Sequence, residues 1–259
     1  MALSREDEAK ISEVVSVLRR SRSILFITGA GVSADSGLPT YRGVGGLYGD
    51  EDAADGIPVE MAMAGRMLTI SPEITWKHLS RIEQASRGAR FNRAHEVIAE
   101  MERHFERVWV LTQNVDGFHR QAGSRNVIDI HGDCHELSCM GCEYHLTVRD
   151  YSGLEIPPRC PECGSVIRPD VVLFGEQLPI EKVRTLKEQL RNGFDCIFTV
   201  GTTSVFPYIA EPVISAKFGG IPTIEINPGV TEVSFAVDIR IRAGAAETLD
   251  AIWKRYRGE

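Results

Sequence analysis

Short apolar runs recur along the chain, each rich in β-branched side chains and each ending at glycine or polar residues. Runs of this length and composition are typical of strands that a sheet buries on both faces. The pattern predicts five strands, at residues 24–28, 108–112, 127–130, 196–200 and 223–226.

Helical periodicity fills several of the intervals between these runs. Apolar residues three and four positions apart predict helices over residues 11–18, 94–105 and 180–190. Ser4, followed by acidic residues, suits the start of the first helix. Strands that alternate with helices predict an α/β fold with a doubly wound, parallel, Rossmann-like sheet.

Every predicted strand ends in residues that can bind a ligand or catalyse a reaction. The runs end in Gly-Ala-Gly (29–31), Gln-Asn-Val-Asp (113–116), His-Gly (131–132), Gly-Thr-Thr (201–203) and Asn-Pro (227–228). Parallel strands bring their carboxyl ends to one edge of the sheet, and open α/β sheets bind ligands there. We therefore predict a functional site at that edge.

Two segments do not follow the alternation. Residues 43–91 are rich in glycine and methionine and then helical, and residues 133–169 contain four cysteines and few apolar side chains. We predict that the two insertions form one smaller lobe. Residues 1–42, 92–132 and 170–259 would then form the sheet domain.

The cysteines of the second insertion have the spacing of a zinc ribbon. Two residues separate Cys139 from Cys142 and Cys160 from Cys163, and 17 residues separate the pairs. Four thiolates bind zinc tetrahedrally and leave no position open for water, so we predict a structural zinc. The alternative is four free surface thiols. Cys134 is expected to be a packing thiol.

Composition narrows the classes of function. The chain has 259 residues, of which 43% are hydrophobic, and a formal charge of −7. An acidic balance argues against nucleic acid as the main partner but does not exclude a basic peptide. No apolar stretch reaches the roughly 18 residues that span a bilayer. The polar first ten residues lack the core of a secretion signal. We expect a cytoplasmic protein with no membrane partner.

The loop after the first strand has the pattern of a dinucleotide-binding fingerprint. Gly29 and Gly31 are followed by Ala34 in the third small position. Glycines there let backbone N–H groups approach a pyrophosphate at a helix N-terminus. Taken alone, this pattern does not decide the function.

The motifs taken together identify a family. Residues 29–43, GAGVSADSGLPTYRG, resemble the NAD-binding loop of the sirtuins, the NAD-dependent protein lysine deacylases, and in particular the bacterial type. The likeness runs from about residue 20 to the last residues and keeps the family's order. It continues through TQNVDGFHRQAG (112–123), IHG (130–132), the paired cysteines, RPDVVLFGE (168–176), GTTSVFP (201–207) and INP (226–228).

The resemblance implies both a reaction and its catalytic residues. In the family the acyl amide oxygen attacks the anomeric carbon of the nicotinamide ribose, nicotinamide leaves, and the acyl group ends on ADP-ribose. His131 would be the general base for a ribose hydroxyl. Asn114 and Asp116 would hold the nicotinamide carboxamide and the ribose, because an amide both donates and accepts. The alternatives are a structural histidine and a capped turn.

The resemblance also assigns NAD contacts and a substrate strand. Arg42 would reach the pyrophosphate, Tyr41 would shield the reactive carbon where most members carry phenylalanine, and Gln113 would bind ribose hydroxyls. Further NAD contacts are expected at Gly29, Ala30, Gly31, Ser33, Ala34, Gly201, Thr202, Ser204, Asn227 and Ala245. The substrate peptide would add as a strand along Val171, Val172, Leu173 and Phe174, unless this stretch is one more core strand.

Two residues bear on the acyl group. One branch of the family, which prefers succinyl and malonyl groups, carries Tyr and Arg three residues apart on a helix. Counting back from Asn92 without gaps places His78 and Arg81 at these positions, on one helix face. The alternative is that both coat a solvated face. We expect deacetylation as the basal activity, with some removal of succinyl groups.

The function predicted is therefore NAD-dependent deacylation of lysine in protein substrates, by a chain we expect to be a monomer. Mono-ADP-ribosyl transfer is an alternative, since it uses the same activated ribose. A catalytically silent NAD-sensing module is another. The intact His131, Asn114 and Asp116 count against that second alternative.

Overall fold

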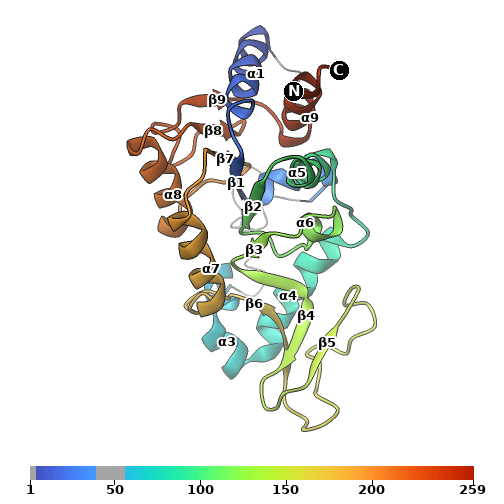
Figure 1. The fold of residues 1–259 in the computed structure, drawn as a ribbon. Helices are drawn as coiled ribbons and strands as arrows, with labels where there is room; N and C mark the ends of the chain where they lie inside the picture. The colour runs from blue at the N-terminus through green and yellow to red at the C-terminus, as the bar shows by residue number, and fades with distance from the viewer. Residues whose placement is uncertain (1–3, 39–55) are drawn as a thin grey trace.

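The computed structural model describes residues 4–38 and 56–259 and contains the predicted parallel sheet (Figure 1). Six strands lie in the order β3-β2-β1-β7-β8-β9, and all of them are parallel. Along the chain this is the 3-2-1-4-5-6 order of a doubly wound Rossmann fold. The strands are β1 (Ser23–Thr28), β2 (Arg107–Thr112), β3 (Val127–Asp129), β7 (Cys196–Val200), β8 (Thr223–Ile226) and β9 (Ile239–Ile241).

All five predicted strands are confirmed, whereas β9 was not predicted. β9 is a three-residue strand in which a polar residue separates two isoleucines. So short an alternation does not differ from loop sequence.

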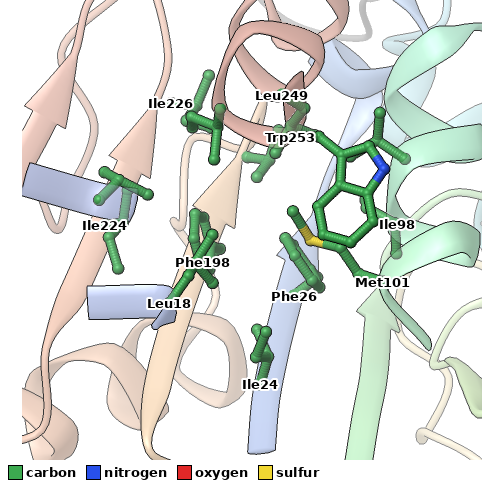
Figure 2. Close-up of a cluster of buried hydrophobic side chains, with 14 of the residues drawn as sticks. Leu18, Ile24, Phe26, Ile98, Met101, Phe198, Ile224, Ile226, Leu249 and Trp253 are labelled. Atoms are coloured by element: carbon green, nitrogen blue, oxygen red, sulfur yellow. The ribbon is translucent and has the colours of Figure 1, made fainter. Parts of the chain in front are cut away.

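Helices cover both faces of the sheet because alternate residues of each strand point to opposite sides. Ile24 and Phe26 of β1 join the core under α1 (Arg5–Leu18), α5 (Arg93–His104) and α9 (Ala245–Arg257), as Figure 2 shows. Leu25 and Ile27 join a second core, under α7 (Ile180–Arg191) and α8 (Pro207–Phe218). None of the described helices is long and apolar enough to cross a membrane.

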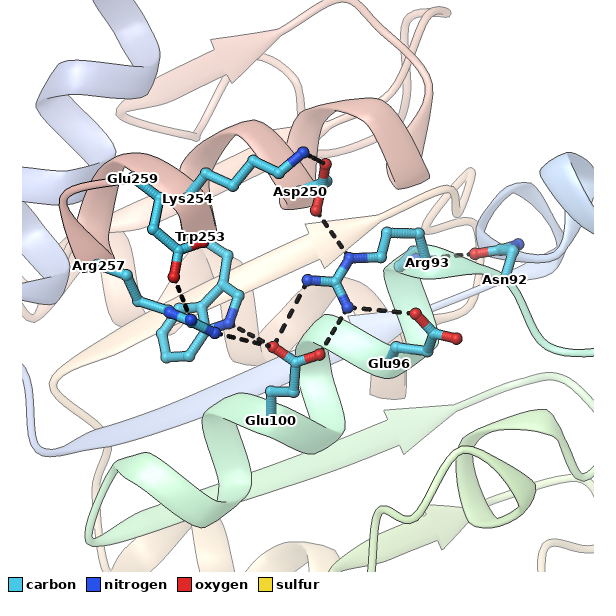
Figure 3. Close-up of polar contacts among 10 residues, drawn as sticks. Asn92, Arg93, Glu96, Glu100, Asp250, Trp253, Lys254, Arg257 and Glu259 are labelled. Carbon is cyan, nitrogen blue, oxygen red and sulfur yellow. Dashed lines mark hydrogen bonds and ion pairs between the residues drawn. The ribbon is translucent and has the colours of Figure 1, made fainter.

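A capping box and a group of polar contacts stabilise the helices α1, α5 and α9 on one face of the sheet. The helix start predicted at Ser4 is confirmed, and Ser4 and Asp7 form a capping box there. Arg93 of α5 pairs with Asp250 of α9 at 2.7 Å and with Glu100 of its own helix at 2.5 Å (Figure 3). The indole N–H of Trp253 donates to the same Glu100 carboxylate at 2.6 Å.

The smaller lobe has a core of its own. An antiparallel sheet in the order β5-β4-β6 packs with the helices that precede α5. The indole of Trp76 lies in this core and donates to the Ile167 carbonyl at 2.9 Å, which joins the two insertions. The elements are α2 (Val59–Ala62), α3 (Gly65–Ile70), α4 (Pro72–Ser86), β4 (Gly132–Cys139), β5 (His145–Thr147) and β6 (Ile167–Val171).

The predicted boundary at residue 170 lies inside β6. Val171 and Leu173 pack into the core of the smaller lobe, on the far side of that boundary. The division of the chain between the two lobes otherwise stays a prediction.

Gly132 lies where the chain passes from the parallel sheet into the smaller lobe. It has φ of +96°, and a Cβ there would lie 1.8 Å from the Asp170 carbonyl oxygen. It pairs with Val171 as the first residue of β4, directly after His131. Both the left-handed backbone and the close approach therefore require glycine at this position.

We expect Gly132→Ala to lower the free energy of unfolding by ~3 kcal/mol or more, since backbone strain and a backbone clash add. Urea denaturation measures the change. Gly153→Ala is the matched control, because a Cβ there meets nothing within 4 Å. Equal stabilities of the two variants would contradict this account of Gly132.

Candidate functional site

Two glycine loops meet where the strand order reverses, between β1 and β7. The Gly31 N–H donates to the Gly201 carbonyl at 2.8 Å, and the Gly29 N–H donates to the Val200 carbonyl at 3.2 Å. A Cβ on Gly31 would lie 2.6 Å from the Gly201 Cα, and one on Gly201 would lie 2.4 Å from the Gly31 carbonyl carbon. The close approach of the two backbones therefore leaves no room for a side chain at Gly31 or at Gly201.

The chain leaves β1 through two short 3-10 turns, Ala30–Val32 and Ala34–Ser36. The fingerprint predicts the N-terminus of a helix here, and the structure has two three-residue 3-10 helices in place of a longer α-helix. Ala245 is the buried first residue of α9, and the Ala246 N–H donates to Asp35 of the second turn at 3.1 Å. The predicted residues Tyr41 and Arg42 lie outside the described part of the chain.

Ser33 brings Asn114 and Asp116 into one network. The Ser33 hydroxyl donates to Asp116 Oδ2 at 2.7 Å and accepts from Asn114 Nδ2 at 3.1 Å. Asn114 Nδ2 also donates to the Gly29 carbonyl at 3.2 Å. Both amide hydrogens of Asn114 are therefore engaged, which leaves its carbonyl oxygen to accept from a carboxamide. Burial raises the pKa of the Asp116 carboxyl, against the hydrogen bonds that it accepts from the Phe118 backbone N–H and from Ser33.

Two buried histidines support this network, and sequence reasoning assigned neither of them a role. His95 Nε2 lies 3.5 Å from the Ser33 hydroxyl, and His119 Nε2 lies 2.9 Å from the Thr28 hydroxyl. Their ring centroids are 4.8 Å apart. Burial lowers the pKa of His95 to about 4 and that of His119 well below its usual value, so both are neutral at pH 7. His119 lies in the motif at residues 112–123, which was the available signal for it.

His131 lies between β3 and β4 with both ring nitrogens engaged. Nδ1 is 3.0 Å from the Gln113 carbonyl oxygen, and Nε2 is 2.6 Å from the hydroxyl of Tyr208. A carbonyl can only accept, so Nδ1 carries the proton and Nε2 presents a lone pair. Burial, aided by the charge of Lys182, lowers the pKa of His131 against the opposing bond to Gln113. The imidazole is therefore a neutral base at pH 7.

A second group of predicted residues gathers around Thr202. The Gln113 amide donates to the Thr202 hydroxyl at 2.7 Å, and the Asn227 amide donates to the Thr202 carbonyl at 3.0 Å. Ser204 has φ of +55°, and its buried hydroxyl has no partner among the described residues. A buried polar group of this kind fits a bound polar ligand such as a nucleotide.

The predicted peptide-binding stretch is already paired in part with the chain itself. The Val172 N–H donates to the His131 carbonyl at 2.8 Å, and Phe174 exchanges backbone bonds with Met63 and Gly65. Val171 is buried, whereas Val172 and Phe174 are only partly so. Residues 171–174 therefore border the site and also pair with the rest of the chain. The alternative of a core strand thus holds for part of this stretch.

His78 and Arg81 lie in different environments on α4. His78 is buried, whereas Arg81 is exposed. The alternative that both coat a solvated helix face is thus wrong for His78. Their expected role at the acyl group stays a prediction.

Four cysteine sulfurs gather at the far end of the smaller lobe. All of them lie within 4.8 Å of one another, with 3.4 Å between the sulfurs of Cys139 and Cys163 and 3.6 Å between those of Cys142 and Cys160. A tetrahedral zinc with Zn–S bonds of about 2.3 Å needs sulfurs ~3.8 Å apart. The four residues therefore fit one zinc ion.

The zinc centre is separated from His131 by the length of β4. This strand runs from Gly132, next to His131, to Cys139, which is a distance of about 20 Å at the usual rise per residue. The metal consequently stabilises the lobe and takes no part in chemistry at His131.

Comparisons with known proteins agree with this arrangement. The sequence model of the Sir2 family matches residues 29–207. NAD-dependent protein deacylase 2 of Pseudomonas aeruginosa is 47% identical over 250 residues, which cover 95% of this chain and 97% of that protein.

Two solved structures show the same likeness in three dimensions. A Sir2 homologue in complex with NAD is 33% identical with a TM-score of 0.84, over 95% of this chain and 94% of that one. A Sir2 protein with a deacetylated p53 peptide and 3′-O-acetyl ADP-ribose is 27% identical, also with a TM-score of 0.84, over 95% and 98% of the two chains.

We expect chelation of zinc, or Cys160→Ala, to lower the melting temperature by roughly 10 °C or more, because binding free energy at such sites is folding free energy. Differential scanning fluorimetry with metal analysis by mass spectrometry measures both quantities. Cys134→Ser is the control and should keep one zinc per chain. A metal-free protein that melts unchanged would exclude the structural role.

Proposed function

The chain belongs to the Sir2 family, and from that premise we propose that it removes acyl groups from protein lysine side chains at the expense of NAD. The products are nicotinamide, the free lysine and O-acyl-ADP-ribose. One observation carries the proposal: the neutral, partly buried imidazole of His131 shares a sheet edge with the Ser33, Asn114 and Asp116 network.

NAD supplies the electrophilic ribose carbon and the leaving group, and the residues described here hold and orient it. Gln113, Thr202, Ser204 and Asn227 form the nucleotide side of the site. We assign the carboxamide and its ribose to Asn114 and Asp116, since Ser33 fixes both side chains. Short bonds and burial pre-organise these groups before NAD arrives.

His131 acts as the base for a ribose hydroxyl. The Gln113 carbonyl holds the proton at Nδ1, so the lone pair at Nε2 is the group that accepts the second proton. Burial disfavours the resulting imidazolium, and the low pKa of His131 helps the ring to release the proton again.

Acylated lysine peptides are the proposed protein substrates, with backbone recognition near Val172 and Phe174. One measurement distinguishes deacylation from mono-ADP-ribosyl transfer. It is the ratio of nicotinamide released to lysine deacylated, which is 1:1 for a deacylase. A location in the cytoplasm and a monomeric state stay predictions from the sequence.

We expect His131→Ala to lower kcat/KM for NAD at least ~100-fold, the usual cost of losing a general base. The zinc content and the affinity for NAD should remain. His104→Ala, which removes an exposed imidazole, is the control. Because the base acts when neutral and its pKa lies below 6.5, wild-type activity should decline only on the acid side of pH 6.5. Near-normal turnover in His131→Ala would refute the assignment.

We further propose that Arg81 allows some removal of succinyl groups, since among the described residues its exposed guanidinium has no ion-pair partner. A charge-assisted bond at an exposed site is expected to change the succinyl-to-acetyl ratio of kcat/KM about 10-fold. The ratio is measured with one peptide in wild type, Arg81→Met and, as the charge-keeping control, Arg81→Lys. An unchanged ratio in Arg81→Met would show that Arg81 does not reach the acyl group.

A further inference from the structure

His131, the proposed general base, has a hydrogen-bond partner that the sequence motifs did not indicate. The hydroxyl of Tyr208, the second residue of α8, lies 2.6 Å from Nε2 of His131. Nε2 is the atom that must accept the ribose proton. We propose that Tyr208 is a positioning residue: its hydroxyl caps Nε2 in the free enzyme and is exchanged for the ribose hydroxyl when NAD binds.

The direction of this hydrogen bond follows from the tautomer. Nδ1 carries its proton toward the Gln113 carbonyl, so Nε2 can only accept and the Tyr208 hydroxyl must donate. A single lone pair accepts one strong hydrogen bond. The Tyr208 hydroxyl and a ribose hydroxyl therefore compete for the same atom.

Aromatic packing holds Tyr208 in this position. Its ring stacks on Phe206 with centroids 5.4 Å apart and an angle of 11° between the planes. Both rings meet His131 edge-on, at centroid distances of 5.8 Å for Phe206 and 6.0 Å for Tyr208. The pair follows directly on the loop that contains Thr202 and Ser204. Nucleotide binding at that loop is thus adjacent to the residues that cap the base.

Tyr208 is a donor here and does not replace His131 as the base. Burial raises the pKa of its phenol to about 12, so the hydroxyl keeps its proton at neutral pH. No covalent change at Tyr208 is involved, because the exchange swaps one hydrogen-bond donor for another.

The remaining charged groups around His131 are paired and stay the same in a Tyr208 variant. Lys182 of α7 binds the carboxylate of Asp129, at the end of β3, at 2.8 Å, and also donates to the Asp129 carbonyl at 2.8 Å. Tyr208 approaches from α8 and the Gln113 carbonyl from the loop after β2. A change in the pKa of His131 in Tyr208→Phe can therefore be attributed to the loss of the Tyr208 hydroxyl.

Tyr208→Phe tests the exchange, because it removes the hydroxyl and keeps the stacked ring. This inference rests on the proposed function for its kinetic part. With the competing donor gone, kcat/KM for NAD should rise about threefold to tenfold, while kcat stays within about twofold. The pKa of His131, followed by ¹⁵N NMR in the absence of NAD, should rise, since a donor to Nε2 stabilises the neutral ring.

Tyr256→Phe is the matched control. Tyr256 Oη lies 3.3 Å from Nε2 of His104, and its ring stacks on Trp253 at 5.4 Å, which repeats the contact away from the site. It should leave the kinetic constants and the His131 signals unchanged. Tyr208→Met, which lacks both ring and hydroxyl, should move the pKa of His131 in the same direction as Tyr208→Phe.

Two results would overturn the proposal. A fall of kcat by tenfold or more in Tyr208→Phe, with the pKa of His131 unchanged, would place the hydroxyl in the reaction itself. Unchanged kinetics together with an unchanged pKa would show that the contact has no role. If the wild type did not deacylate peptides, the proposed function would be wrong. The NMR titration of the free enzyme would still show whether the Tyr208 hydroxyl donates to His131.

Discussion

The backbones of Gly31 and Gly201 lie so close together that neither residue can carry a side chain, and the rest of the site depends on this approach. It closes the ends of β1 and β7 against each other at the point where the strand order reverses. Asn114 can then reach the Gly29 carbonyl, and Gln113 can reach Thr202 across the junction. Residues that follow three different strands therefore lie close together, and none of them needs a long loop to reach the site.

The two lobes divide the work between chemistry and support. His131 is held from both sides, by the Gln113 carbonyl at the parallel sheet and by its own peptide bond to Gly132 at the start of β4. The four cysteines lie at the other end of β4, where Cys160 also packs into the core of the smaller lobe. The metal therefore affects the base only through the position of this strand.

Much of this arrangement could be predicted from the sequence, because buried parallel strands and paired cysteines leave strong local patterns. Ile24 to Thr28 and Cys196 to Val200 are such strands, and the four thiolates follow from spacing alone. Tyr208, His95 and His119 could not be found this way. Their roles come from side chains that meet across elements, as when α8 delivers a phenol to a histidine 77 positions earlier in the chain. Three-residue β9 was missed for the opposite reason, since its pattern is too short to differ from a loop.

The buried pair of His95 and His119 makes folding a proton-linked equilibrium. Both imidazoles are neutral when folded, with pKa values below the ordinary 6.5, and both titrate normally once the chain unfolds. Below pH 6.5 these two histidines therefore bind protons in the unfolded chain but stay neutral in the folded chain until the pH reaches their lower pKa values. Each ring contributes stability that is complete above pH 6.5 and is lost toward the folded pKa, by up to ~1.4 kcal/mol per pH unit. The two histidines that lie against Ser33 and Thr28 therefore make the folded state less stable in acid.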